Sequence, residues 1–137
     1  MTSLISIIIP NYNRESLIAQ TLDSIISQTY ENWECIIVDD ISSDNSLSII
    51  EEYQKKDNRF KAFQRPIDSP KGANVCRNIG LEKAAGDYII FFDSDDLMTK
   101  NHLERKLNLI CSGDFNFAVT KTEYFNNPQN IDQIYYQ

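Results

Sequence analysis

The sequence lacks the short motifs that mark several classes of nucleotide-binding and hydrolytic domain. No Gly-x-Gly-x-x-Gly follows the first apolar segment, which excludes the pyrophosphate turn of a dinucleotide-binding Rossmann site. No Gly-x-x-x-x-Gly-Lys-Ser/Thr is present, which excludes a P-loop NTPase. No Gly-x-Ser-x-Gly elbow offers a hydrolase serine. A nucleotide site in this chain must therefore be built from other residues.

Positive charge and long apolar runs are also scarce. The 137 residues hold 13 Lys and Arg against 20 Asp and Glu, a net charge of −7, whereas a nucleic-acid binder would present a basic face. The negative charge makes unaided binding of an anionic ligand unfavourable, so a bridging cation is attractive. No apolar run approaches the roughly 20 residues of a membrane span. No basic segment followed by an apolar one marks a signal peptide. We expect a cytoplasmic protein, in solution or at the inner face of the membrane.

The few cysteines do not form a zinc-binding pattern. Cys35, Cys76 and Cys111 are odd in number and match no zinc-ligand spacing. Each falls in an expected strand or helix among apolar neighbours, so we expect buried thiols in a reducing compartment. The single histidine, His102, is expected at the surface rather than as a ligand.

The apolar pattern predicts alternating strands and helices in one domain, residues 1–137, without repeat or linker. Asn13 is expected to cap the first helix and Gly86 to terminate the third. Alternation of this kind predicts a mainly parallel sheet with helices on both faces. The expected strands are 4–10, 33–38, 60–64, 88–92 and 115–119, and the expected helices end near residues 28, 56, 85 and 111.

One strand leads directly into a cluster of acids. Tyr88 to Phe92 are five consecutive apolar residues, which predicts a strand buried on both faces. Asp93, Asp95 and Asp96 follow within four positions, and such a cluster repels itself unless a cation is close. Ligands of open α/β sheets bind beyond the carboxyl ends of the strands, and hard divalent cations prefer oxygen ligands. We therefore expect a metal held by Asp93 and Asp95, with a phosphate compound beside it.

Two further segments reach the same edge of the predicted sheet. The loop that begins at Pro10 carries Tyr12, which can stack on a base. Asp39 or Asp40, after the second strand, can accept hydrogen bonds from a base or from sugar hydroxyls. Arg77 lies on the helix before the strand at 88–92 and can face a phosphate or carbonyl oxygen. Together these residues predict a nucleotide site.

Structural roles are alternatives for the same residues. Tyr12 would then pack over the first helix, and one of the two acids Asp39 and Asp40 would cap a turn. Arg77 would pair with Glu82 or Asp87.

The motifs resemble those of the N-terminal half of the family 2 glycosyltransferases, which have the GT-A fold. The resemblance covers roughly residues 4–125, with the motifs in the family's order. It implies a three-layer α/β/α sandwich with a mainly parallel, Rossmann-like central sheet, shortened at its C-terminus. The matching segments are residues 6–13, 24–30, 34–44, 73–80 with Arg77-Asn78, and 86–96.

The resemblance implies transfer of a sugar from a UDP- or GDP-sugar to an acceptor hydroxyl, in cell-surface polysaccharide or glycan synthesis. Pro10 and Tyr12 would line the base and ribose, and Asp40 would accept a hydrogen bond from the base. The acceptor would be a saccharide or a lipid-linked saccharide, and no nucleic acid is expected as a partner.

Asp93-Ser94-Asp95 stands where the family has its Asp-x-Asp motif. By that resemblance Asp95 would ligate Mn²⁺ or Mg²⁺, while Asp93 would hold the ribose or share the metal. Ser94 and Arg77 would join the nucleotide-sugar site.

The sequence departs from the family in several places. Ile41 stands where a glycine is common, and Thr99-Lys100 replaces a proline common after the acid motif. The family's catalytic domains continue well beyond this length, and the further part carries the acceptor site and the catalytic base, so we name no catalytic residue. An exposed edge or apolar face in a shortened sheet would favour a homo-oligomer.

Two other functions are compatible with parts of the pattern. One is a domain that binds the donor but transfers nothing. The other is a phosphohydrolase of the haloacid dehalogenase type, which also has an Asp-x-Asp after an apolar strand. That motif usually lies near the N-terminus and has Thr or Val at the place that Leu97 occupies here.

Overall fold

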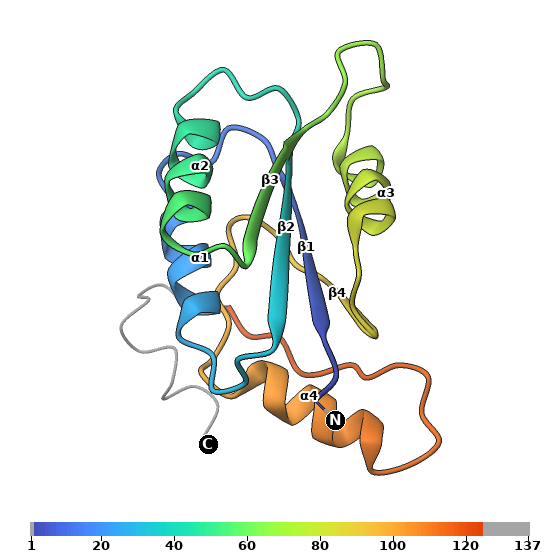
Figure 1. Cartoon of the computed structure of the whole chain (residues 1–137). Coiled ribbons are helices and arrows are strands. Elements are labelled where there is room, and N and C mark those ends of the chain that lie inside the picture. The colour runs from blue at the N-terminus through green and yellow to red at the C-terminus, as the bar shows by residue number, and fades with distance from the viewer. Residues whose placement is uncertain (1, 125–137) are drawn as a thin grey trace. The chain divides into compact units, whose positions relative to one another are not determined.

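The computed structural model of the protein describes residues 2–124, which form two compact units (Figure 1). The first unit comprises residues 2–22 and 32–96, and the second comprises residues 23–31 and 97–124. The elements in chain order are β1 (Ile5–Asn11), α1 (Ile18–Ile26), β2 (Trp33–Asp39), α2 (Ser46–Lys56), β3 (Phe60–Gln64), α3 (Ala73–Lys83), β4 (Tyr88–Phe91) and α4 (His102–Cys111).

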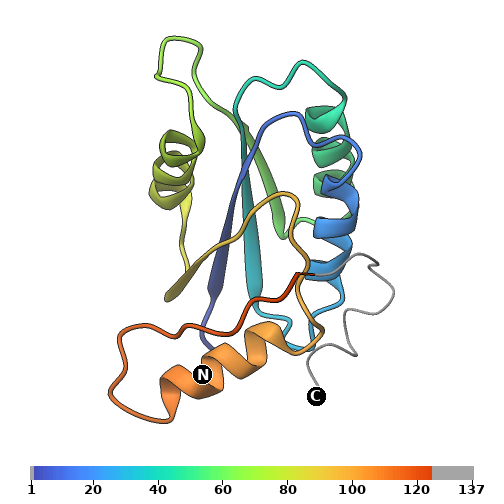
Figure 2. The same ribbon diagram turned by 180° about the vertical axis from the view of Figure 1, so that it is seen from behind.

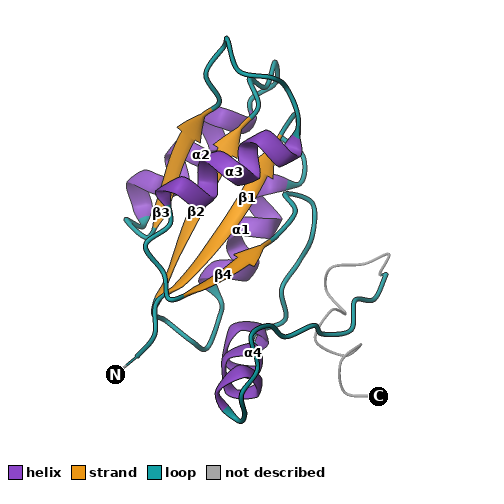
Figure 3. Cartoon of the chain, turned by 90° about the vertical axis from the view of Figure 1, so that its right-hand side faces the viewer, coloured by secondary structure: helices purple, strands orange, loops and turns teal. Residues whose placement is uncertain are grey.

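The first unit is built on a four-stranded parallel sheet in the order β3-β2-β1-β4. In register, Ile5 of β1 lies beside Trp33 of β2 and Tyr88 of β4. Helices α1 and α2 cover one face, and α3 covers the other (Figures 2 and 3). The predicted three-layer α/β architecture with a mainly parallel sheet is therefore confirmed.

The core lies around the two central strands, in which every residue of β1 and β2 is buried. The α1 and α2 side contributes Ile18, Leu22 and Ile50. On the other side α3 approaches the sheet closely at Gly80, where an added Cβ would lie 2.5 Å from Cγ2 of Ile8. A close approach of this kind leaves room for glycine alone.

A buried carboxylate joins three strands near their amino ends. Glu34 of β2 accepts hydrogen bonds from Ser6 Oγ (2.6 Å), Lys61 Nζ (2.5 Å) and the Ala85 main-chain N–H (2.7 Å). Ser6 Oγ in turn accepts from the Gly86 N–H at 2.9 Å. Burial raises the pKa of Glu34, but the bonds from Lys61, Ser6 and Ala85 outweigh it and hold the pKa below its usual value.

Two strand predictions are corrected. The apolar strand before the acid cluster is an edge strand: in the described part of the chain β4 pairs only with β1, and Ile89 and Phe91 are 36% and 52% exposed. The predicted strand at 115–119 is wrong, because these residues form no regular structure and Phe115, Phe117 and Val119 are exposed. Alternating apolar residues make a strand only where a neighbouring strand can pair with them.

The two predicted helix caps are also wrong. α1 begins at Ile18, and Asn13 instead has φ 48° and accepts a hydrogen bond from the Ser43 N–H (2.8 Å). α3 ends at Lys83, ahead of Gly86. Gly86 serves close packing, since an added Cβ would lie 2.7 Å from the main-chain nitrogen of Ser6.

In the second unit, Gln28 forms hydrogen bonds with the segment before α4 and with the first turn of α4. Its side chain donates to the Thr99 carbonyl oxygen (2.7 Å) and accepts from the Leu103 N–H (3.1 Å). His102 is half-buried rather than at the surface, and Cys111 is exposed rather than buried. Cys35 and Cys76 are buried, as predicted. None of the helices within residues 2–124 is long and apolar enough to cross a membrane.

Candidate functional site

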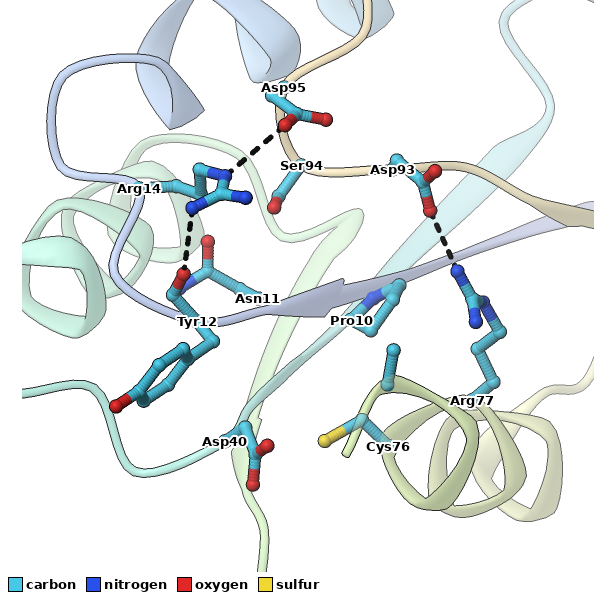
Figure 4. Close-up of a pocket in the computed structure, with 11 residues that line it drawn as sticks. Pro10, Asn11, Tyr12, Arg14, Asp40, Cys76, Arg77, Asp93, Ser94 and Asp95 are labelled. Atoms are coloured by element: carbon cyan, nitrogen blue, oxygen red, sulfur yellow. Dashed lines mark hydrogen bonds and ion pairs between the residues drawn. The ribbon is translucent and has the colours of Figure 1, made fainter. Parts of the chain in front are cut away.

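Loops that follow parallel strands meet at one edge of the sheet and enclose a pocket of about 290 Å³ (Figure 4). Because β1, β2 and β4 are parallel, their carboxyl ends and the segments after them lie together. The first turns of α3 complete the wall. The lining residues are Pro10, Asn11, Tyr12, Arg14, Asp40, Ala73, Cys76, Arg77, Asp93, Ser94 and Asp95.

The acid motif forms a turn directly after β4, which we call the acid turn (Asp93–Asp96). Its middle is fixed, since Ser94 is buried and its carbonyl oxygen accepts a hydrogen bond from Thr21 Oγ1 of α1 at 3.0 Å. The side chains of Asp93 and Asp95 on either side are 55% and 41% exposed. The turn therefore presents two accessible carboxylates on a backbone that is fixed by a hydrogen bond.

Each of these two carboxylates is paired with an arginine (Figure 4). Arg77 Nη2 of α3 lies 2.8 Å from Asp93 Oδ1, so Arg77 pairs with the acid turn rather than with Glu82 or Asp87. Arg14 Nε lies 3.2 Å from Asp95 Oδ2. Sequence reasoning missed Arg14, although its place one loop after the first strand was a usable signal. The arrangement supplies positive charge where the sequence as a whole has little.

The third acid of the turn, Asp96, lies in a partly buried and negatively charged environment. Burial, together with the neighbouring Asp93 and Asp95, raises the pKa of Asp96 above its usual value. No group of three or more His, Cys, Asp or Glu side chains within residues 2–124 is arranged to hold a metal by itself. Mg²⁺ sites commonly use one or two carboxylates together with substrate phosphates, and Asp93 and Asp95 fit that donor set.

Of the two acids after β2, Asp39 shapes the backbone. It is fully buried, and its oxygens accept from Asn11 Nδ2 (2.8 Å), Ser42 Oγ (2.6 Å) and the Ser42 N–H (2.8 Å). These bonds close a tight turn in which Ile41 has φ 57°. A β-branched residue is strained in this left-handed region, which fits the glycine that the family resemblance leads one to expect at this place.

Asp40 lines the pocket and also organises the loop that follows β3. Its Oδ1 is paired with Nε of Arg65, and its Oδ2 accepts from the Gly72 N–H at 2.9 Å. Arg65 is 2% exposed and donates further to the carbonyl oxygens of Pro66 (2.9 Å) and Ser69. An ionised carboxylate has about four acceptor sites, so Asp40 keeps capacity for a ligand. Arg65 was not predicted, because nothing in the sequence near it points to Asp40.

The remaining wall is less polar. Tyr12 is 51% exposed, and its ring lies on the Asp40 side of the pocket, where it can meet a ligand instead of being buried against α1 (Figure 4). Pro10, Ala73 and the buried Cys76 also line the pocket. Burial, followed by the negative charge of Asp40, raises the pKa of Cys76 to about 11, so its thiol is uncharged at neutral pH.

An α/β domain with a pocket and an acid turn at the carboxyl ends of its strands has the layout of a nucleotide-binding domain. The comparison with known proteins gives the family. The profile described as Glycosyl transferase family 2 matches residues 6–136, and the chain belongs to this family. Membership argues against the phosphohydrolase alternative.

Named relatives and solved structures show the same similarity. The Escherichia coli UDP-Glc:alpha-D-GlcNAc-diphosphoundecaprenol beta-1,3-glucosyltransferase WfgD is 38% identical over 124 residues, 90% of this chain and 47% of that protein. S. aureus TarS 1-349 in complex with UDP-GlcNAc has a TM-score of 0.71 at 34% identity, covering 79% of this chain and 31% of that one. The mannosyltransferase PcManGT from Pyrobaculum calidifontis, in complex with GDP-Man and Mn²⁺, has a TM-score of 0.64 at 25% identity, covering 71% and 29%.

These similarities identify the fold as GT-A, as the resemblance implied. The chain spans less than half the length of the curated relatives it matches, between 42% and 47% for three of them.

Proposed function

We propose that this chain binds the donor of a glycosyltransferase that transfers a sugar from a UDP- or GDP-sugar to an acceptor hydroxyl. One observation carries the proposal: an exposed tyrosine and an acid turn line the same pocket. An aromatic ring suits a base, and a pair of carboxylates suits a metal-bound diphosphate. TarS bound to UDP-GlcNAc and PcManGT bound to GDP-Man support a nucleotide-sugar ligand.

Within the pocket we assign the base and ribose to the side of Pro10 and Tyr12. Asp40 accepts a hydrogen bond from the base while retaining Arg65. Its depth favours this role, because only 9% of the residue is exposed and its carboxylate is fixed by two protein donors. A fixed acceptor discriminates between bases better than a mobile one, since its geometry is set before the ligand arrives.

We assign the diphosphate and metal to the acid turn. Asp95 and Asp93 hold Mn²⁺ or Mg²⁺, with Asp93 also able to accept from the ribose, and Ser94 and Arg77 border the diphosphate. The metal supplies charge neutralisation at the departing diphosphate. The PcManGT complex, which contains both GDP-Man and Mn²⁺, supports a divalent cation beside a nucleotide sugar.

We propose a saccharide or lipid-linked saccharide as acceptor, in the synthesis of a cell-surface polysaccharide at the inner face of the membrane. The acceptor in the name of WfgD, a diphosphoundecaprenol-linked sugar, supports this class. A domain that binds donor without transferring it is the alternative, and release of free UDP from a UDP-sugar on adding acceptor would exclude it.

Calorimetric titration with UDP and with GDP, in the presence of Mn²⁺ and in the presence of EDTA, tests the donor site. We expect binding of one nucleotide that depends on Mn²⁺, and loss of that dependence in Asp95→Ala. Glu51→Ala removes the same charge from the exposed surface of α2 and should behave as wild type. Equal nucleotide affinity with Mn²⁺ and with EDTA in the wild type would overturn the metal-bridged site.

A further inference from the structure

We infer that Arg14 exchanges partners when the donor binds: it neutralises Asp95 in the ligand-free protein and donates to the diphosphate once a divalent cation occupies Asp95. The inference rests on the proposed function, because it requires a metal at the acid turn. It adds a ligand-binding residue to the pocket and gives that residue a second role before the ligand arrives.

The backbone of Arg14 is fixed while its side chain reaches across the pocket. Its main-chain N–H donates to Ser46 Oγ at 2.8 Å, and Ser46 is fully buried at the start of α2. The guanidinium lies 3.2 Å from Asp95 through Nε, and Nη1 contacts the carbonyl oxygens of Tyr12 (3.4 Å) and Asn13 (3.2 Å). Arg14 therefore links Tyr12 to Asp95 of the acid turn (Figure 4).

The pair between Arg14 and Asp95 is easily broken. The two side chains are 43% and 41% exposed, and exposed ion pairs contribute little to stability. A divalent cation carries twice the charge of a guanidinium and prefers carboxylate oxygens. Because both cations need the same carboxylate, metal binding at Asp95 and the Arg14 pair compete.

Charge in the pocket determines where the released guanidinium goes. Each of the three carboxylates that line the pocket is paired with an arginine: Asp40 with Arg65, Asp93 with Arg77, and Asp95 with Arg14. A divalent metal repels a neighbouring guanidinium, whereas a diphosphate attracts it and matches its planar fork of donors. Of the two arginines at the acid turn, Arg14 is the more exposed, with 43% of its side chain accessible against 28% for Arg77.

The exchange has a signature that a structural role alone would not produce. Replacing Arg14 by an uncharged residue removes a competitor of the metal but also removes a ligand of the diphosphate. Binding of metal alone should therefore become tighter, while binding of the metal-bound nucleotide becomes weaker. Binding of a nucleoside without phosphates should stay the same.

The test compares Arg14→Gln with the wild type and with Lys55→Gln, which removes the same charge from an exposed position on α2. Water-proton relaxation measures the affinity for Mn²⁺ alone, and calorimetry measures the affinity for UDP at saturating Mn²⁺. NMR titration measures the affinity for uridine. If UDP does not bind, GDP and guanosine replace UDP and uridine. For Arg14→Gln we expect Mn²⁺ to bind about two- to fivefold tighter, the gain from losing an exposed ion pair. UDP should bind about tenfold weaker, the loss of a hydrogen bond to a charged group. Uridine binding and all values for Lys55→Gln should be unchanged.

A second measurement follows Arg14 in the wild type. The Nε–H resonance of Arg14, identified by its absence in Arg14→Gln, should shift when Mg²⁺ is added and shift again with UDP. Arg14→Lys keeps the positive charge but lacks the planar set of N–H donors of the guanidinium. It should therefore bind Mn²⁺ like the wild type and UDP less tightly.

The outcomes separate this inference from the proposed function. If the wild type binds Mn²⁺ through Asp95 but Arg14→Gln changes both affinities in the same direction, or neither, the exchange is wrong and the donor site stands. An unshifted Nε–H resonance at saturating Mg²⁺ overturns the exchange in the same way. If the wild type binds no Mn²⁺ with or without nucleotide, the metal site and the exchange both fall.

Discussion

The hydroxyl of Thr21 on α1 donates a 3.0 Å hydrogen bond to the carbonyl oxygen of Ser94, the residue between the two exposed aspartates of the acid turn. Thr21 is fully buried and lies outside the pocket. The bond ties the backbone of the acid turn to a helix packed on the sheet. The positions of Asp93 and Asp95 therefore depend on a residue outside the pocket.

Thr21→Val should loosen the acid turn. Valine keeps the shape of threonine but leaves the buried Ser94 carbonyl without this donor, which should lower the free energy of unfolding by about 1–2 kcal/mol. Affinity for UDP with Mn²⁺ should fall as well, because the two carboxylates lose their fixed spacing. Denaturant unfolding and calorimetry measure the two effects. Thr21→Ser, which retains the hydroxyl, should keep wild-type nucleotide affinity; equal affinity in Thr21→Val would show that the turn is held elsewhere.

Arg65→Met should cost far more stability than the same substitution at an exposed pair. It leaves the carboxylate of Asp40 buried with the Gly72 N–H as its remaining donor within residues 2–124, and breaking a buried ion pair costs about 3–5 kcal/mol. Arg14→Met removes a pair with both partners over 40% exposed and should cost below about 1 kcal/mol. Urea unfolding of the two variants gives the comparison. Similar losses in the free energy of unfolding would show that the buried carboxylate of Asp40 does not need Arg65.

The location of the site was predictable because it follows from chain direction alone. Once β1, β2 and β4 are parallel, the loop at Tyr12, the acid pair and the acid turn must share one edge of the sheet. The sequence signals for these strands are strong, since each is an apolar, β-branched or aromatic run that ends at polar residues.

The partners within the site were not predictable, because they depend on distant segments. Asp39 and Asp40 are adjacent and chemically identical, and only the tertiary structure shows that one closes a turn while the other binds Arg65. The position of β4 at the sheet edge is likewise absent from its sequence, because an apolar run suits a central or an edge strand. Arg14 has an ordinary loop sequence around it, and its role depends on Asp95, 81 residues further along the chain.

Ile41→Gly should stabilise the protein although it removes a side chain. Ile41 has φ 57°, a conformation that costs a non-glycine residue about 1–2 kcal/mol. Part of this gain is lost because glycine makes the unfolded chain more flexible, so the free energy of unfolding should rise by about 0.5–1 kcal/mol. Thermal unfolding measures the change. Ile67→Gly, at an exposed loop position without positive φ, should lower stability instead. Destabilisation in both variants would mean that the Ile41 side chain stabilises the turn more than its backbone strains it.

Glu34 should make the protein sensitive to acid at the end of the sheet away from the pocket. Its folded-state pKa lies below the usual 4.5, because hydrogen bonds from Lys61, Ser6 and Ala85 outweigh the effect of burial. Below pH 4.5 the unfolded chain therefore binds the proton more readily, so the stabilisation by Glu34 is complete above that pH and is lost as the pH falls through the folded pKa.

Glu34→Gln should be less stable than wild type at pH 7, by about 1–3 kcal/mol for the disrupted buried acceptor, and should lose less stability on acidification. Lys61→Met keeps the carboxylate but removes its cation, which raises the folded-state pKa of Glu34 towards that of the unfolded chain. This variant should therefore be less stable than the wild type at pH 7 and should lose less stability on acidification. Denaturant unfolding between pH 3 and 7 gives the three curves, and parallel curves for wild type and Glu34→Gln would assign the acid sensitivity to other carboxylates.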